Sequence, residues 1–207
     1  MARTLSGTRG GPVPAHVAWV AGGTERAASA DQVEHALGVL VETAQRLGIG
    51  WLTIQEPSGG SALKRRAREL ASRRIALAFV PGANHRGPAA RDLALVESPI
   101  LRVLLAEGRT GRRELVAAVQ ALADRGVPPK DVTEAVIAEA LGLPDVDLLV
   151  LTGGDRRVPD LLVWQVAYSE IVVLDEPWPE VSAELVGAAV AEYQRRDRRY
   201  GGLVASR

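Results

Sequence analysis

The stretch that decides the fold runs from Asp147 to Pro179 and reads DLLVLTGGDRRVPDLLVWQVAYSEIVVLDEPWP. Its apolar runs, glycine pair and amphipathic middle predict, in order, a strand, a turn with two arginines, a helix, and a second strand closed by a Trp-Pro pair. These parts occupy residues 147–151, 152–157, 160–168, 171–174 and 178–179. A strand that opens through glycines into a helix can bind phosphate through backbone N–H groups. The stretch therefore predicts an α/β fold with an anion site.

The rest of the chain repeats this alternation of strand and helix. Short apolar runs predict four more strands, at 16–20, 51–54, 75–80 and 100–105. Apolar residues at helical spacing predict helices at 31–47, 61–72, 112–124, 131–141 and 181–196. Residues 81–99, where glycine and proline are frequent at the start, are expected to be loop. Alternating elements form a mostly parallel sheet covered on both faces. We expect one six-stranded α/β domain over 15–207, behind a flexible leader over 1–14.

Composition limits the classes of function. Of 207 residues, 47% are apolar and 24% are charged, and the formal net charge is zero, so a nucleic-acid partner is not expected. The chain has no cysteine, which excludes disulfides, thiol catalysis and zinc–cysteine sites. No apolar run reaches the length of a membrane span. These features predict a cytoplasmic protein.

The loops that follow the strands carry the candidate site, because ligands bind at the carboxyl ends of parallel strands. In the turn after residue 151, Arg157 could clamp a phosphate with two parallel hydrogen bonds. Asp155 and Glu170, at the two ends of the same unit, could hold Mg²⁺ together with substrate phosphates. The ordinary alternatives stay open: a plain glycine turn, a capping aspartate, and a glutamate on a solvated strand edge.

The histidines and serines give weaker evidence for a functional site. His16, at the start of a strand, is expected to be a surface residue with its hydrogen bonds satisfied, and His35 to lie on a solvated helix face. His85 lies in a loop, and the three histidines show no metal-binding spacing. The serines of Ser58-Gly-Gly-Ser61 have no base nearby, so nucleophilic catalysis is not indicated. The sequence GGTER at 22–26 is not the GxGxxG of dinucleotide sites.

Three of the quoted motifs resemble the cis-prenyltransferase family, the undecaprenyl and dehydrodolichyl diphosphate synthases. DLLVLTGGDRR, LVWQVAYSE and WP are similar to the family's DLLIRTSGExR, LLWQxAYxE and WP, and weaker matches are HVA at 16–18 and RRYGG at 198–202. The resemblance runs over about 16–207 and is most specific in the last third. It implies the family's α/β fold, prenyl diphosphate substrates and two sets of site residues. The diphosphate ligands would be Gly23, Arg26, Arg157, Arg199 and Gly201, and the Mg²⁺ ligands Asp155 and Glu170.

The chain departs from the family's pattern where the chemistry lies. The catalytic aspartate falls on Gly22, the asparagine after it on Thr24, and the first arginine of the diphosphate clamp on Leu151. The motif after the second strand is reduced to Ser58-Gly-Gly-Ser61, and the region that lines the product tunnel is shortened. Because charged groups of this kind contribute factors of about 10² to 10³ each, little chain elongation is expected.

This combination is similar to the accessory subunits of two-component cis-prenyltransferases, which keep the fold and dimer face but lack the catalytic acid. Their terminal Arg-x-Gly reaches across the dimer to the partner's diphosphate site, and Arg199-Tyr200-Gly201 matches that tail. The resemblance implies a non-catalytic accessory subunit that pairs with a catalytic cis-prenyltransferase subunit in a heterodimer, or with itself in a homodimer. Mg²⁺ would bind with the partner or the substrate diphosphate, and the lipid product would hold the complex at the membrane periphery. Unlike eukaryotic accessory subunits, the chain shows no N-terminal membrane span.

Two other functions stay open. The retained Asp155, Arg157 and Glu170 suit a stand-alone, atypical prenyl diphosphate synthase or cyclase that acts on short prenyl diphosphates. A homodimer that binds a prenyl diphosphate as a sensor, without turning it over, is the third hypothesis.

Overall fold

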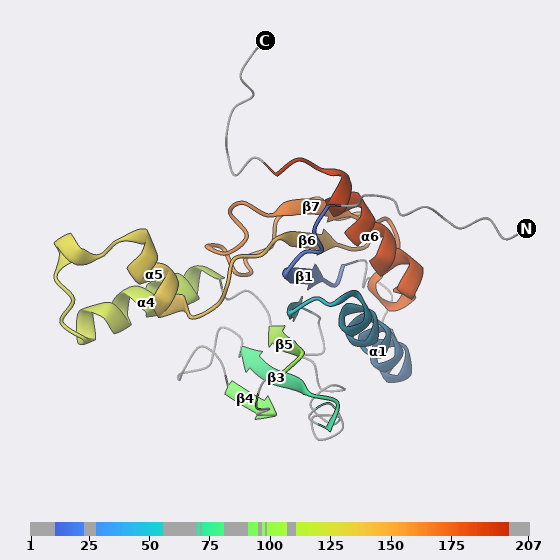
Figure 1. The fold of residues 1–207 in the computed structure, drawn as a ribbon, viewed down its shortest axis with the longest axis horizontal. Helices are drawn as coiled ribbons and strands as arrows, with labels where there is room; N and C mark the ends of the chain where they lie inside the picture. The colour runs from blue at the N-terminus through green and yellow to red at the C-terminus, as the bar shows by residue number, and fades with distance from the viewer. Residues whose placement is uncertain are drawn as a thin grey trace, which may run out of the picture.

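A seven-stranded sheet forms the centre of the molecule (Figure 1). The structure, a computed structural model, describes residues 11–22, 28–55, 70, 72–80, 91–94, 97, 99–106 and 111–198. Its strands are β1 (His16–Val20), β2 (Trp51–Gln55), β3 (Ile75–Val80), β4 (Arg91–Ala94), β5 (Leu101–Ala106), β6 (Leu148–Leu151) and β7 (Glu170–Val173). They lie in the order β4-β3-β5-β2-β1-β6-β7.

The predicted parallel sheet of six strands is confirmed. Every neighbouring pair from β3 to β7 runs parallel, so the carboxyl ends of these strands share one edge of the sheet. The expectation of loop throughout 81–99 is wrong at one place. There β4 pairs with β3 as a short antiparallel strand at the edge of the sheet.

Four α-helices and two 3₁₀ turns lie in the described part of the chain: α1 (Ala30–Leu47), α4 (Gly111–Asp124), η1 (Pro129–Asp131), α5 (Glu134–Leu141), η2 (Trp178–Glu180) and α6 (Ala183–Arg195). Ser29 starts α1 with a capping box to Gln32, and Gly48 ends it in the left-handed conformation, with φ of 77°. Of the predicted helix at 61–72, only residues 70 and 72 are described, so that prediction stays a prediction. No helix among the described residues is both long and apolar enough to cross a bilayer.

The predicted helix at 160–168 is wrong. These residues form bends and turns, and Leu162 takes a left-handed backbone conformation with φ of 44° that an α-helix does not admit. Leu161 and Leu162 are both buried, so packing of two adjacent leucines overrides the helical spacing of the sequence. The segment leads the chain from the carboxyl end of β6 back to the start of β7.

The sheet has a hydrophobic core on each face. Along β1, Val17 and Trp19 pack into one core and Ala18 into the other, as the alternation of a strand requires. The larger core lies under α1 and α6, which contact each other on one side of the sheet (Figure 1). Helices α4 and α5 pack on each other and project away from the sheet (Figure 1).

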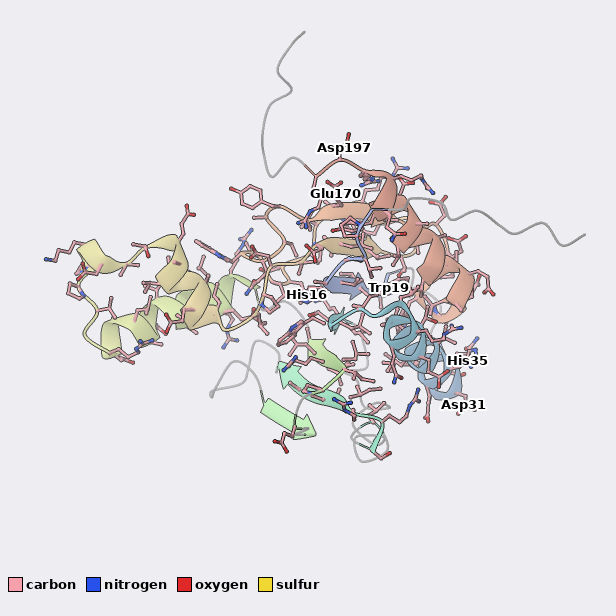
Figure 2. The ribbon with its side chains drawn as sticks, viewed as in Figure 1. His16, Trp19, Asp31, His35, Glu170 and Asp197 are labelled. Carbon is pink, nitrogen blue, oxygen red and sulfur yellow. The ribbon has the colours of Figure 1, made fainter. Side chains whose placement is uncertain are left out.

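His16 is buried, so the expectation of a surface histidine is wrong. Its side chain is 1% exposed and lies within the molecule at the amino edge of the sheet (Figure 2). Nδ1 lies 3.0 Å from the carbonyl oxygen of Pro144, and Nε2 lies 2.9 Å from Oγ1 of Thr53. Because a carbonyl only accepts, the neutral ring donates from Nδ1 and accepts from the Thr53 hydroxyl at Nε2. Burial lowers the pKa of His16.

Candidate functional site

The candidate site forms where β1 and β6 end side by side. Gly22 follows the end of β1 by two residues, and Thr152, which is 2% exposed, directly follows β6. The Thr152 hydroxyl accepts from the Gly22 N–H at 2.8 Å and donates to the Val20 carbonyl at 3.0 Å. The Thr152 N–H also donates to Val20, at 3.2 Å. One buried threonine therefore ties the two strand ends together.

Gly22 lies too close to Thr152 for any side chain to fit. A Cβ atom added to Gly22 would lie 2.2 Å from the carbonyl oxygen of Thr152 and 3.2 Å from its carbonyl carbon. The first distance is well inside van der Waals contact, and the obstacle is backbone rather than a movable side chain. The space where the family's aspartate would begin is therefore filled by the turn after β6.

The two glycines of that turn have a structural role. Gly153 and Gly154 both take positive φ, 72° and 70°, which glycine adopts without a steric penalty. Their N–H groups donate to the carbonyls of Glu176 and Leu174, at 2.8 and 2.9 Å. These donors hold the turn against the segment after β7. The hypothesis that they bind a phosphate is wrong for this conformation.

Asp155 and Arg157 form a closed ion pair beside the turn. The Asp155 carboxylate accepts from Nε and Nη2 of Arg157, at 3.0 and 2.8 Å, and also from its backbone N–H at 3.0 Å. These hydrogen bonds lower the pKa of Asp155 to about 2 and raise the pKa of Arg157. The Arg157 side chain is 89% exposed, so it can meet an anion from solvent, but it meets Asp155 first.

Glu170 lies at the opposite edge of the sheet. It pairs in register with Leu148, the first residue of β6, whereas Asp155 follows the last. A four-residue strand spans roughly 10 Å. The carboxylate of Glu170, which is labelled in Figure 2, accepts at 3.2 Å from Arg196, the residue after α6.

The proposed magnesium ligands therefore do not fit one ion within a single chain. Asp155 and Glu170 are on different edges and each faces an arginine. Within the described ranges, no three histidine, aspartate or glutamate side chains converge on a point.

Several predicted site residues lie outside the described residues. These are Gly23, Arg26, Arg199 and Gly201, together with Thr24, Ser58, Ser61 and His85. Their roles remain predictions from the sequence.

Sequence reasoning missed Asp147, which precedes β6 at the amino edge. Its Oδ2 accepts the N–H groups of Ala15 and His16, at 2.7 and 3.1 Å, and its Oδ1 accepts from Arg198. An acid directly before a buried strand, matched by an arginine run near the chain end, was the only signal available in the sequence.

Known proteins resemble the second half of the chain most clearly. Residues 94–201 match the family described as "Putative undecaprenyl diphosphate synthase". An isoprenyl transferase of Porphyromonas gingivalis is 36% identical over 108 residues, covering 49% of this chain and 42% of that protein. One from Geobacillus kaustophilus is 43% identical over 101 residues, covering 45% and 39%. A ditrans,polycis-undecaprenyl-diphosphate synthase of Micrococcus luteus is 36% identical over 110 residues, covering 50% and 44%.

Solved structures match over nearly the whole chain. Lavandulyl diphosphate synthase from Lavandula x intermedia superposes with a TM-score of 0.67 at 20% identity, covering 91% of this chain and 98% of that one. A probable undecaprenyl diphosphate synthase from Campylobacter jejuni gives 0.67 at 18% identity, with the same coverage. These likenesses show the fold.

Family membership follows from the sequence match. The matches to the curated relatives span about two fifths of those proteins' length. The family match at 94–201 covers just over half of this chain of 207 residues. The chain therefore belongs to the undecaprenyl diphosphate synthase family of cis-prenyltransferases.

Proposed function

We propose that the chain is a non-catalytic accessory subunit of a heteromeric cis-prenyltransferase, in which a partner chain synthesises the polyprenyl diphosphate. The observation that carries the proposal is the contact at Gly22. The family's acid falls on this residue, and a Cβ there would meet the Thr152 carbonyl oxygen at 2.2 Å. The position thus lacks a carboxylate and also lacks the space for one.

A second family position supports the same conclusion. The first arginine of the diphosphate clamp falls on Leu151, which is 2% exposed and packs in the second core. An isolated guanidinium at such a place would be costly to bury. With the acid and this arginine both absent, each normally contributing a factor of about 10² to 10³, turnover by this chain alone is expected to be negligible.

The position of the chain end supports action on another molecule. Arg198 binds Asp147 at the amino edge of the sheet, whereas Gly22 and Thr152 lie at the carboxyl edge. Arg198, the residue before the tail motif, therefore lies at the edge away from this chain's own candidate site. In the proposed pair, Arg199 and the Gly201 backbone contact the diphosphate in the partner's site. Mg²⁺ enters with the partner or the substrate, and the lipid product keeps the pair near a membrane.

Reconstitution tests the proposal. The chain is mixed with a catalytic cis-prenyltransferase subunit from the same genome, farnesyl diphosphate, Mg²⁺ and labelled isopentenyl diphosphate. We expect co-elution of the two chains, no product from this chain alone, and more labelled product from the pair than from the partner alone. An Arg199→Ala variant should still co-elute but lose the stimulation. Absence of both co-elution and stimulation overturns the proposal.

The intact Asp155–Arg157 pair favours one alternative, a stand-alone synthase or cyclase for short prenyl diphosphates, because an exposed arginine next to the strand ends can bind a diphosphate. Incubating the chain alone with Mg²⁺ and dimethylallyl, geranyl or farnesyl diphosphate distinguishes the two. Any product replaces the accessory role by this activity. Saturable binding in calorimetry without product or partner stimulation would instead support a sensor.

A further inference from the structure

The last residues that the structure describes, 194–198, are held by three contacts, and those of Arg196 and Arg198 lie at the amino edge of the sheet. Nη1 of Arg196 donates to the Glu170 carboxylate and, at 2.8 Å, to the Ile171 carbonyl. Gln194 exchanges two hydrogen bonds with the backbone of Gly11. The third contact, between Arg198 and Asp147, is nearest to the tail.

Asp147 joins segments that are far apart in the sequence. Through Oδ2 it holds Ala15 and His16 at the entry to β1, and through Oδ1 it holds Arg198 beyond α6. The side chains of Asp147 and Arg198 are only 17% and 20% exposed, so solvent screens this pair less than a surface ion pair. Tyr193 packs on the same guanidinium, with its ring centre 5.9 Å from Cζ and its hydroxyl 3.4 Å from Nη1.

An arginine held on two sides by an anion and an aromatic ring has little freedom, and Arg196, two residues before it, is also held. The next residue along the chain is Arg199, the first of the tail motif. Restricting the start of a short segment raises its effective concentration at one target and lowers the entropy lost on binding.

We infer that Asp147 is a positioning residue. Through Arg198 it sets the point and direction from which the tail leaves the domain, and so aligns Arg199 and Gly201 with a diphosphate in the partner's site. This inference rests on the proposed function. It adds a role for a side chain that touches neither substrate nor metal.

The first measurement examines the contact between Asp147 and Arg198, here called the Asp147–Arg198 clamp, without any partner chain. Because the chain has no cysteine, Asp197→Cys, at an exposed position between the two clamped arginines, accepts a single nitroxide label. In the parent, we expect a broadened electron paramagnetic resonance spectrum, which indicates restricted motion of the label. Adding Asp147→Asn should narrow the lines, because the label moves more freely. The matched control is Asp145→Asn, the same exchange at an exposed position two residues upstream, which should leave the spectrum unchanged.

The second measurement separates positioning from folding. In the reconstituted pair, without the label, Asp147→Asn should raise KM for isopentenyl diphosphate on the order of tenfold, the factor that one charged hydrogen bond typically represents. The kcat and the affinity between the chains should stay near the parent values. Arg198→Met should give the same change, and the double variant should add nothing further if the two side chains act as a pair.

The outcomes are distinct. An unchanged spectrum in Asp147→Asn overturns the clamp, whatever the kinetics show. A mobile label with unchanged KM, in a pair that the parent chain does stimulate, overturns the positioning role and leaves a structural ion pair. If the parent stimulates no catalytic partner, the proposed function fails, and the positioning role fails with it.

Discussion

At the scale of single residues, the contact between Gly22 and Thr152 has the largest consequence for chemistry. The Gly22 N–H is bound by the Thr152 hydroxyl at 2.8 Å, and the Gly22 carbonyl accepts from the backbone N–H of Trp178 at 3.1 Å. Gly22 is therefore fixed on both its polar groups. Its backbone cannot turn to give room to a side chain without losing these two hydrogen bonds.

A Gly22→Ala variant should accordingly be less stable than the parent. Overpacking of a well-packed site costs typically 1–3 kcal/mol, and we expect a loss of about that size in the free energy of unfolding, measured in urea. Gly187→Ala is the control, because nothing lies within 4 Å of its added Cβ in α6 and alanine favours a helix by about 1 kcal/mol. Equal stability of Gly22→Ala and the parent would contradict the crowding at this position.

The lowered pKa of buried His16 predicts how the free energy of unfolding depends on pH. Its pKa is lowered in the folded chain, and in the unfolded chain it is about 6.5. Above pH 6.5 the ring is neutral in both states and its contribution is fully present. As the pH falls below 6.5, the unfolded chain binds a proton that the folded chain does not, so stability falls by up to about 1.4 kcal/mol per pH unit until the folded pKa is reached.

Urea unfolding at a series of pH values checks this slope. His16→Gln should reduce the slope, because it removes the group whose pKa differs between the folded and unfolded chains. If His16→Gln does not fold, an NMR titration of the parent gives the pKa of His16 directly. A value at or above 6.5 would refute the prediction.

At the scale of elements, α1 depends on its first turn. Ser29 accepts from the Gln32 N–H at 3.2 Å, and the Gln32 side chain accepts from the Ser29 N–H at 2.9 Å. The helix that starts there buries Leu37 and Leu40 against the sheet beneath α6. The cap thus stabilises α1, one of the two helices that pack on the larger core.

Ser29→Ala should lower the free energy of unfolding by about 1 kcal/mol, because the helix loses a side-chain acceptor at its N-terminus. Thermal and urea unfolding measure the change. Ser29→Asp is the matched comparison, since aspartate is an equally good cap and should keep the stability of the parent. A loss in Ser29→Asp equal to that in Ser29→Ala would assign the effect to something other than capping.

At the scale of the whole molecule, the parallel sheet separates two groups of charged residues. Asp155 and Arg157 follow the carboxyl end of β6, whereas Glu170 and Arg196 meet at the start of β7. The length of the strands therefore keeps the two acids apart.

Mg²⁺ alone should consequently have no effect on the isolated chain. A cation that binds the folded state raises its stability in proportion to RT ln(1 + [L]/Kd), so millimolar Mg²⁺ should leave the midpoint of thermal unfolding unchanged. A sodium salt at the same ionic strength, without Mg²⁺, is the control. A saturable rise with Mg²⁺ would show that a metal site exists within one chain.

The sequence predicted what depends on local pattern. Short apolar runs that stop at glycine or charged residues located all six parallel strands, because a strand buried on both faces reads as a continuous apolar run. The four-residue β4 was missed, since a short edge strand carries a weak pattern. The buried state of His16 depends on Pro144 and Thr53, which lie far from it in the sequence.

The predictions about the site that were wrong or missing concern residues whose distance depends on the register between distant segments. Asp155 and Glu170 are fifteen positions apart, and only the parallel pairing of β6 with β7 reveals that they lie on opposite edges. The closeness of Gly22 to Thr152 requires β1 and β6 to be neighbours, although the two residues are 130 positions apart in the sequence. The turn at 160–168 was misread because its sequence suits an amphipathic helix, whereas tertiary packing buries the adjacent Leu161 and Leu162.

The crowding at Gly22 also bears on the history of the chain. A single codon change that returned an acid to position 22 would first meet the Thr152 carbonyl, so the intermediate genotype would fold less well without recovering a function. Recovery requires the turn after β6 to move as well, and selection has no advantage to act on until both changes are present. Position 22 is therefore expected to stay glycine for as long as selection maintains the fold, because no single substitution there brings an advantage.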